Sequence, residues 1–270
     1  MTTQWLERSA LVTVKTYPTP SEKYHETVCT AAVTKEEGWL RLYPIQFRDL
    51  PRHQQYAKYQ VIKLRMTKHE GDARPESFRP DEKTIEVLET LGTVNDKQWQ
   101  RRREWIDPTQ SASMCEIQRE QKRTGKSLGV FRPKEVTDLV FEEDDPEWSG
   151  KKQGILNQMR LFYEKQLDLE KIPYSFKYKY ICEDANCKGH TQSIIDWEIM
   201  ELYRNVKRSS QDENEVKQKL RQKFLDQLCG PGRSTSFFVG SHSRYPATFM
   251  ILGVFWPPKP VASLFESLPC

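Results

Sequence analysis

The sequence TVCTAAVTKEEGWLRLYPI, residues 27–45, contains two β-like runs joined by a charged turn that ends on Gly38. Residues 27–34 and 39–45 alternate polar with apolar residues and are rich in Val, Thr, Leu and Tyr, which is typical of strands. Residues 10–17 and 59–67 have the same character, and Pro or Gly separates the runs. Short strands at this spacing predict a small antiparallel barrel or sandwich.

The rest of the chain mixes both kinds of element. Apolar residues at helical spacing predict helices, and alternating runs predict further strands. We expect helices over 96–105, 111–122, 149–167, 191–207 and 212–228, and strands over 127–131, 135–141, 174–181, 236–239 and 247–256. The sequence therefore predicts an α+β protein with two OB-like antiparallel β-barrels and helical insertions. The expected domains are residues 1–125 and 126–270, the second with an inserted helical hairpin beside a metal-binding corner.

Composition limits the class of protein. The chain has 270 residues, a net charge of +4, 37% hydrophobic and 30% charged residues. This mild basic bias permits nucleic acid as a partner without requiring it. No apolar run approaches the length of a membrane span, and the first residues lack a signal-peptide core, so we expect a cytoplasmic protein with no membrane partner. In a reducing compartment its six cysteines are expected to be thiols or metal ligands.

A metal site is predicted at Cys182, Cys187 and His190, which follow a strand at the spacing Cys-x4-Cys-x2-His. Structural zinc takes four such ligands in a tetrahedron. If helices 191–207 and 212–228 form an antiparallel hairpin of two equally long helices, the chain returns so that Cys229 lies beside His190. The predicted zinc ligands are thus Cys182, Cys187, His190 and Cys229, and the rival donors for the fourth place are His25, Cys29, Cys115 and His242. The alternative is a set of ordinary thiols beside a histidine that caps a helix.

Basic residues interleaved with aromatic ones predict a nucleic-acid surface, because OB barrels stack bases on rings and meet phosphates with Lys or Arg. Three segments have this pattern, at 39–48, 99–105 and 174–180. The alternative is that the rings are core residues and the cations only their solvated neighbours. The candidate residues are Trp39, Arg41, Tyr43, Arg48, Arg101, Arg102, Lys177, Tyr178 and Lys179.

Enzymatic interpretations have less support. Asp196 and Glu198 beside the metal corner raise the alternative of a metal-assisted nuclease or nucleotide-processing enzyme. The segment KRTGKS at 122–127 lacks the first glycine of a P-loop and follows a helix, which excludes that motif. His242, in a Gly-led polar loop, is a further candidate for phosphate contact. No residue is predicted to be catalytic, and the sequence favours a binding protein over an enzyme.

A resemblance extends these expectations. The segments GWLRLYPIQFRDL, CKGHTQSIIDWEIMELYR and ATFMILGVFWPP resemble a bacterial family described as containing a dual OB domain. The resemblance spans the whole chain. It implies two OB-like barrels and an association with prokaryotic conflict and antiviral defence systems, and it supplies no catalytic residue.

Together these observations predict a zinc-stabilised protein that recognises nucleic acid, DNA or RNA, within a bacterial defence or genome-conflict system. A nuclease or helicase is a candidate partner protein. A protein-interaction adaptor is the remaining alternative.

Overall fold

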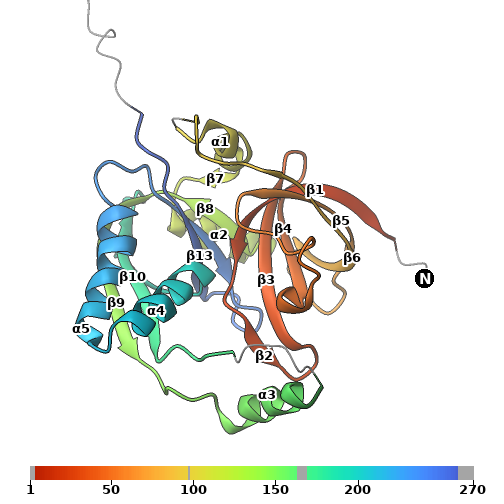
Figure 1. Ribbon diagram of the computed structural model, residues 1–270. Helices are drawn as coiled ribbons and strands as arrows, with labels where there is room; N and C mark the ends of the chain where they lie inside the picture. The colour runs from red at the N-terminus through yellow and green to blue at the C-terminus, as the bar shows by residue number, and fades with distance from the viewer. Residues whose placement is uncertain (1–3, 97, 163–168, 261–270) are drawn as a thin grey trace, which may run out of the picture.

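The computed structural model describes residues 4–96, 98–162 and 169–260 (Figure 1). Its strands are β1 Leu6–Lys15, β2 Thr19–Ser21, β3 His25–Thr34, β4 Gly38–Ile45, β5 Gln60–Lys68, β6 Ser77–Thr90, β7 Gln110–Ser111, β8 Leu128–Phe131, β9 Pro133–Glu143, β10 Tyr174–Cys182, β11 His190–Ile194, β12 Ser236–Ser241 and β13 Phe249–Phe255. Its helices are α1 Gln100–Ile106, α2 Met114–Thr124, α3 Gly150–Phe162, α4 Trp197–Ser209 and α5 Glu213–Arg221, and a π-helical segment, Gln222–Gln227, continues α5. Short 3-10 turns lie at Phe47–Asp49 and Asp107–Thr109.

The first sheet closes into a five-stranded barrel. Its ring order is β1–β5–β6–β4–β3, and β1 also pairs with β3 to complete the ring. The β4–β6 pair is parallel, through Arg41 opposite Ser77 and Leu42 opposite Phe78. The other ring pairs are antiparallel. Short β2 extends the sheet beside β3.

The second sheet has seven strands in the order β7–β8–β12–β13–β11–β10–β9. Its β11–β13 pair is parallel at Ile194 and Ile251, and β7–β8 is also parallel. Only Arg132 separates β8 from β9, yet β8 pairs with β12 and β9 pairs with β10. The chain therefore bends sharply at Arg132 between opposite ends of this sheet.

The two sheets pack on each other through an apolar layer. In β1 the side chains alternate, so that Ala10 and Val12 belong to the cluster inside the barrel and Leu11 to a second cluster outside it. This second cluster joins residues of the barrel wall to Val130, Phe238 and other residues of the second sheet. Since β1 is covered on both sides, its run Ala10–Val14 is wholly buried.

Most predicted elements form near their predicted bounds. The sequence did not predict the long strand β6, because most of its residues, Glu86 and Glu89 among them, are polar and only Ser77, Pro80 and Ile85 are buried. The last residues of the predicted helix 149–167 lie outside the described residues. The α+β class with a closed barrel is confirmed.

The predicted helix 191–207 is wrong in its first part. Residues 190–194 form β11, which pairs with β10, and α4 begins only at Trp197. Asp196 ends the strand and caps the helix, since its carboxylate accepts a hydrogen bond from the Glu198 backbone N–H at 3.1 Å. The second predicted helix has its expected buried face of Val216, Leu220 and Phe224.

Candidate metal centre and ligand cavity

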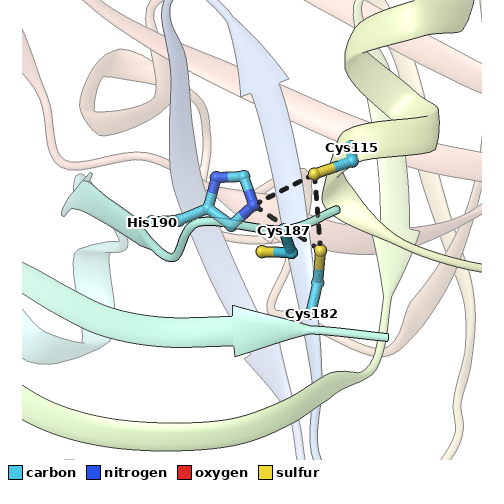
Figure 2. Close-up of side chains that lie close together, drawn as sticks. All are labelled: Cys115, Cys182, Cys187 and His190. Carbon is cyan, nitrogen blue, oxygen red and sulfur yellow. Dashed lines mark hydrogen bonds between the residues drawn. The ribbon is translucent and has the colours of Figure 1, made fainter. Parts of the chain in front are cut away.

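Four side chains from the β10–β11 hairpin and α2 meet at the ends of two strands of the second sheet (Figure 2). Cys182 is the last residue of β10, His190 the first of β11, and Cys187 lies on the loop between them. Cys115, in the first turn of α2, completes the group. Their ligand atoms all lie within 4.8 Å of one another.

The spacing of these atoms suits an ion with tetrahedral coordination. The Sγ atoms of Cys115 and Cys182 are 3.6 Å apart, and His190 Nε2 lies 3.5 Å from each of them. Zinc bonds of about 2.3 Å to sulfur and 2.0–2.1 Å to nitrogen place tetrahedral ligands about 3.8 Å apart for two sulfurs and about 3.5 Å for sulfur and nitrogen. The Cys3His group can therefore hold a metal ion and is compatible with zinc.

Local contacts position the ligands. The Cys187 N–H donates to the Asp184 carbonyl oxygen at 3.0 Å, which closes a turn, and Gly189 N–H donates to Cys187 Sγ at 3.4 Å. Gly189 has a φ of +88°, a region that glycine enters without strain. The ring of Tyr180 stacks on His190 with centroids 5.0 Å apart. These contacts fix the loop and one face of the imidazole.

An ion pair holds α2 against the same loop. Arg119, one turn after Cys115, reaches Asp184 at 2.8 Å. Because solvent screens a pair this exposed, its effect is mainly to orient the helix.

Burial and hydrogen bonding set the acidity of the thiols. Burial raises the pKa of Cys115 to about 12. Burial also opposes ionisation of Cys182, yet hydrogen bonds from the backbone of Cys115 and Asp184, and from Cys187 and His190, lower its pKa to about 6. The group therefore favours a thiolate at Cys182, and a bound cation would displace the remaining thiol protons.

The fourth ligand predicted from the sequence was wrong: the structure places Cys115 in the group and leaves Cys229 outside it. Cys229 Sγ lies 3.4 Å from the Phe224 carbonyl oxygen, behind α5. The prediction assumed two helices of equal length, but part of the first is β11, which removes that return path. The sequence offers Cys115 only as a rival donor, because no sequence pattern links it to Cys182, which lies 67 residues later in the chain.

The two carboxylates of the nuclease alternative, Asp196 and Glu198, pair with a lysine. Lys58 Nζ, from the loop before β5, lies 3.2 Å from Asp196 and 2.8 Å from Glu198. Asp196 is fully buried, and burial raises its pKa to about 6 although Lys58 opposes this. These side chains thus join α4 to the barrel.

A cavity of about 580 Å³ lies between the barrel and the second sheet. The barrel contributes β3, β4, the segment after β1 and the loop between β5 and β6. The second sheet contributes the residue after β11, the last residue of β12, the loop between β12 and β13, and β13 itself. The lining residues used below are Thr27, Arg41, Tyr43, His69, Asp72, Arg74, Ile195, Ser241, His242, Met250 and Leu252.

Arg41 is the most buried cation of this cavity, with only 4% of its surface exposed. Its Nη2 donates to the carbonyl and hydroxyl oxygens of Ser127, at 3.1 and 3.0 Å, and Nη1 lies 3.5 Å from Cys29 Sγ. Gly240 makes room for it, because a Cβ there would lie 3.0 Å from Arg41 Nη2. Ser127, at the end of the rejected P-loop segment, thus has a structural role that its sequence did not indicate.

The predicted nucleic-acid residues fall into different environments. Arg41 and Tyr43 line the cavity. Trp39 is buried in the layer between the sheets against Phe238, and Tyr178 is fully buried with its hydroxyl donating to the Phe224 carbonyl oxygen. Neither of these two rings lies on an open face, because both fill the core.

The remaining candidates lie at the surface, mostly in pairs with acids. Arg48 pairs with Glu26 at 3.0 Å, Arg101 with Glu89, and Lys177 with Glu142. Arg102 lies over the rings of Tyr59 and Trp99 and donates to the Leu91 carbonyl oxygen. Lys179 is exposed on β10. The structure does not bring these cations together at one site.

Sequence reasoning missed the loop between β5 and β6. It brings His69, Asp72 and Arg74 to the cavity, and Arg74 also donates to the Ser241 carbonyl oxygen at 3.0 Å across the two sheets. Its sequence HEGDARP reads only as a polar turn.

Fold and site define an α+β protein with a closed five-stranded barrel, a second sheet and a Cys3His group that could hold a metal ion. The chain belongs to the family described as "Domain of unknown function (DUF8757)", whose model matches residues 110–269. A second model, "Domain of unknown function (DUF8758)", matches residues 7–108. No curated protein matches the chain.

The two matched ranges correspond to the two sheets. Residues 7–108 hold the barrel and α1, and residues 110–269 hold the second sheet with α2. The expected domains had placed α2 in the first unit, whereas its Cys115 joins the metal group of the second sheet. No helix among residues 4–96, 98–162 and 169–260 is long and apolar enough to cross a membrane.

Proposed function

We propose that this protein is a zinc-stabilised, nucleic-acid-binding protein built from two OB-like barrels. The observation that carries the proposal is the position of the cavity. OB folds bind oligonucleotides on their second and third strands and on the loops that flank them. In the barrel these strands are β3 and β4, and the cavity lies on them and on the β5–β6 loop.

The connectivity of both sheets supports OB-like barrels. The barrel is a ring of five strands in which the third and fifth, β4 and β6, are parallel. If β8 and β9 are counted as one strand bent at Arg132, the second sheet has the same ring order, with β11 and β13 as the parallel pair. Helices α4 and α5 then lie between the third and fourth strands of the second barrel.

Zinc is the proposed ion because the donor set is three cysteine sulfurs and one imidazole nitrogen, all within 4.8 Å of one another. When bound, zinc would tie α2 to the β10–β11 loop. Since the four protein ligands fill its coordination sphere, the proposed role is structural. The proposed place of the protein within a bacterial defence or genome-conflict system, with a nuclease or helicase as partner, rests on the sequence resemblance.

A binding panel tests the function. Labelled single- and double-stranded DNA and RNA of about 30 nucleotides would be titrated with the full chain, since one OB fold covers roughly 4–16 nucleotides. Affinity for at least one form should fall steeply between about 50 and 200 mM salt. Absence of binding to all four forms at low salt would refute nucleic-acid binding. A protein partner captured with salt-insensitive affinity would then favour the adaptor alternative.

A paired variant locates the site. Tyr43→Leu should weaken binding by about 5-fold or more, because stacking on a ring contributes roughly 1–3 kcal/mol per base. Trp5→Leu is the matched control, since Trp5 is 42% exposed and lies outside the cavity lining. Equal effects of the two variants would argue against the cavity as the binding face.

A further inference from the structure

The cavity between the sheets contains buried polar atoms without partners. Among the described residues, Arg41 Nε, His69 Nδ1 and Ser241 Oγ are buried and make no hydrogen bond, and all three residues line this cavity. Such atoms are few in native proteins, and each requires an explanation. Because these three residues line one cavity, a polar ligand that reached their unpartnered atoms from it would satisfy them together.

The charge balance of the cavity favours an anion. Arg74 is neutralised by Asp72, which it contacts through Nε at 2.8 Å and through Nη2 at 2.6 Å. Although burial opposes it, hydrogen bonds from Arg74 and Ser77 hold the pKa of Asp72 well below its usual range. The carboxylate therefore remains committed to Arg74.

Arg41 has no comparable partner. Its contacts are the neutral Ser127 and Cys29, and within the described part of the chain no carboxylate lies within 4.0 Å of it. Glu76 is linked to it only indirectly, since its Oε1 accepts from the Ser127 hydroxyl at 2.9 Å. A buried guanidinium without a direct counter-ion is costly, and an anionic ligand beside Nε would remove that cost.

The other walls suit a nucleobase and its sugar. Tyr43 and His242 offer rings, and Ile195, Met250 and Leu252 offer apolar contacts. His242 Nδ1 accepts from the Arg244 and Tyr245 backbone N–H groups at 3.1 and 3.3 Å, so its Nε2 carries the proton and is a donor. The volume lies within the roughly 300–1,000 Å³ of small-ligand sites.

We propose that this cavity binds a single nucleotide through its phosphomonoester, with Arg41, Ser241 and His69 at the phosphate and Tyr43 at the base. The phosphomonoester belongs either to a free mononucleotide or to the phosphorylated end of a strand. This inference deepens the proposed nucleic-acid function and rests on it for the second source. A phosphomonoester carries about −1.5 to −2 charges and three acceptor oxygens, which matches the three unpartnered atoms.

The test compares ligands that differ only in the phosphate. Isothermal titration with the full chain would use adenosine and guanosine against their 5′-monophosphates, and a short single-stranded DNA with a 5′-hydroxyl, 5′-phosphate or 3′-phosphate end. At least one phosphorylated ligand should bind about 10-fold or more tightly than its unphosphorylated form, as expected for hydrogen bonds to a charged group.

Variants of the cavity then assign the contact. Ser241→Ala removes a buried hydroxyl with no partner, so the fold should keep its stability while the phosphate preference falls about 10-fold. Arg41→Lys keeps the charge but loses Nε, and it should also reduce the preference. Lys179→Ala, exposed on β10 and outside the cavity, is the matched control and should leave the preference unchanged.

The outcomes separate this inference from the general function. Strands that bind equally well with and without a terminal phosphate, together with monophosphates no tighter than nucleosides, would overturn the inference and leave nucleic-acid binding intact. Monophosphates that bind in a Ser241-dependent manner while all strands fail to bind would support the inference and refute the function. A phosphate preference that survives both Ser241→Ala and Arg41→Lys would place the phosphate elsewhere and overturn the assignment.

Discussion

Replacing Cys115 distinguishes the Cys3His group seen in the structure from the ligand set predicted from the sequence. Cys115→Ser removes one of four ligands, whereas Cys229→Ser changes a buried thiol outside the group. If zinc binds the folded group and not the unfolded chain, as proposed, its binding energy is folding energy. Zinc content should therefore fall in the first variant and remain about one per chain in the second.

The size of the effect follows from linkage. Loss of a residue that only supports a metal ligand already costs about 10–100-fold in affinity, so loss of the Cys115 thiolate should cost at least about 100-fold. At free zinc above its Kd this removes about 2.7 kcal/mol of stability. For a unit the size of the matched region 110–269, we expect a fall in Tm of about 5–11 °C.

The assay is elemental analysis of protein purified without chelator, followed by thermal unfolding with and without EDTA. EDTA should lower the Tm of the parent chain and of Cys229→Ser, and have little further effect on Cys115→Ser. A parent chain without metal would refute the centre. Loss of zinc from Cys229→Ser, with retention in Cys115→Ser, would show that the ligand set derived from Figure 2 is wrong.

Three further perturbations probe the buried charges and the surface cations. Burial raises the pKa of Glu26 to about 7, above the value near 4.5 that it has in the unfolded chain. Ionisation of this carboxyl therefore lowers the stability of the fold as pH rises from about 4.5 through 7. Scanning calorimetry should show that Glu26→Gln raises Tm at pH 8 and has little effect at pH 4. Lys58→Met leaves Asp196 buried without its cation and should lower the free energy of unfolding in urea by about 3–5 kcal/mol. Adding Asp196→Asn should restore most of that loss. If the losses of the two single variants simply add in the double variant, this coupling is contradicted. Lys177→Ala with Lys179→Ala should leave the slope of log affinity against log salt unchanged, because Lys177 is already paired with a carboxylate and both lysines lie on β10, outside the cavity lining; a fall of roughly 0.7–0.9 per lysine would make β10 part of the nucleic-acid face.

The local sequence pattern was enough to predict which residues share a face where one side of an element faces water. In β10 the alternation predicted Phe176 and Tyr180 on one face and the lysines on the other, as observed, and the structure buries the face with the rings. The residues predicted to be buried in α5 are buried for the same reason, since a 3.6-residue period defines one apolar face. The pattern misled at 191–194, where a short β-branched run beside a helix cap was read as the start of that helix.

The sequence by itself determined an α+β chain rich in short strands, three clustered metal donors at Cys182, Cys187 and His190, and the pairing of rings with cations at Arg41 and Tyr43. Each of these depends on residues close together in the chain. Only the tertiary structure decided that Cys115 is the fourth member of the Cys3His group, that Trp39 and Tyr178 are core, and that Ser241 and His69 line one cavity with Arg41. The reason is physical: these contacts join segments separated by tens to hundreds of residues, and they form only when two sheets bury their shared apolar layer.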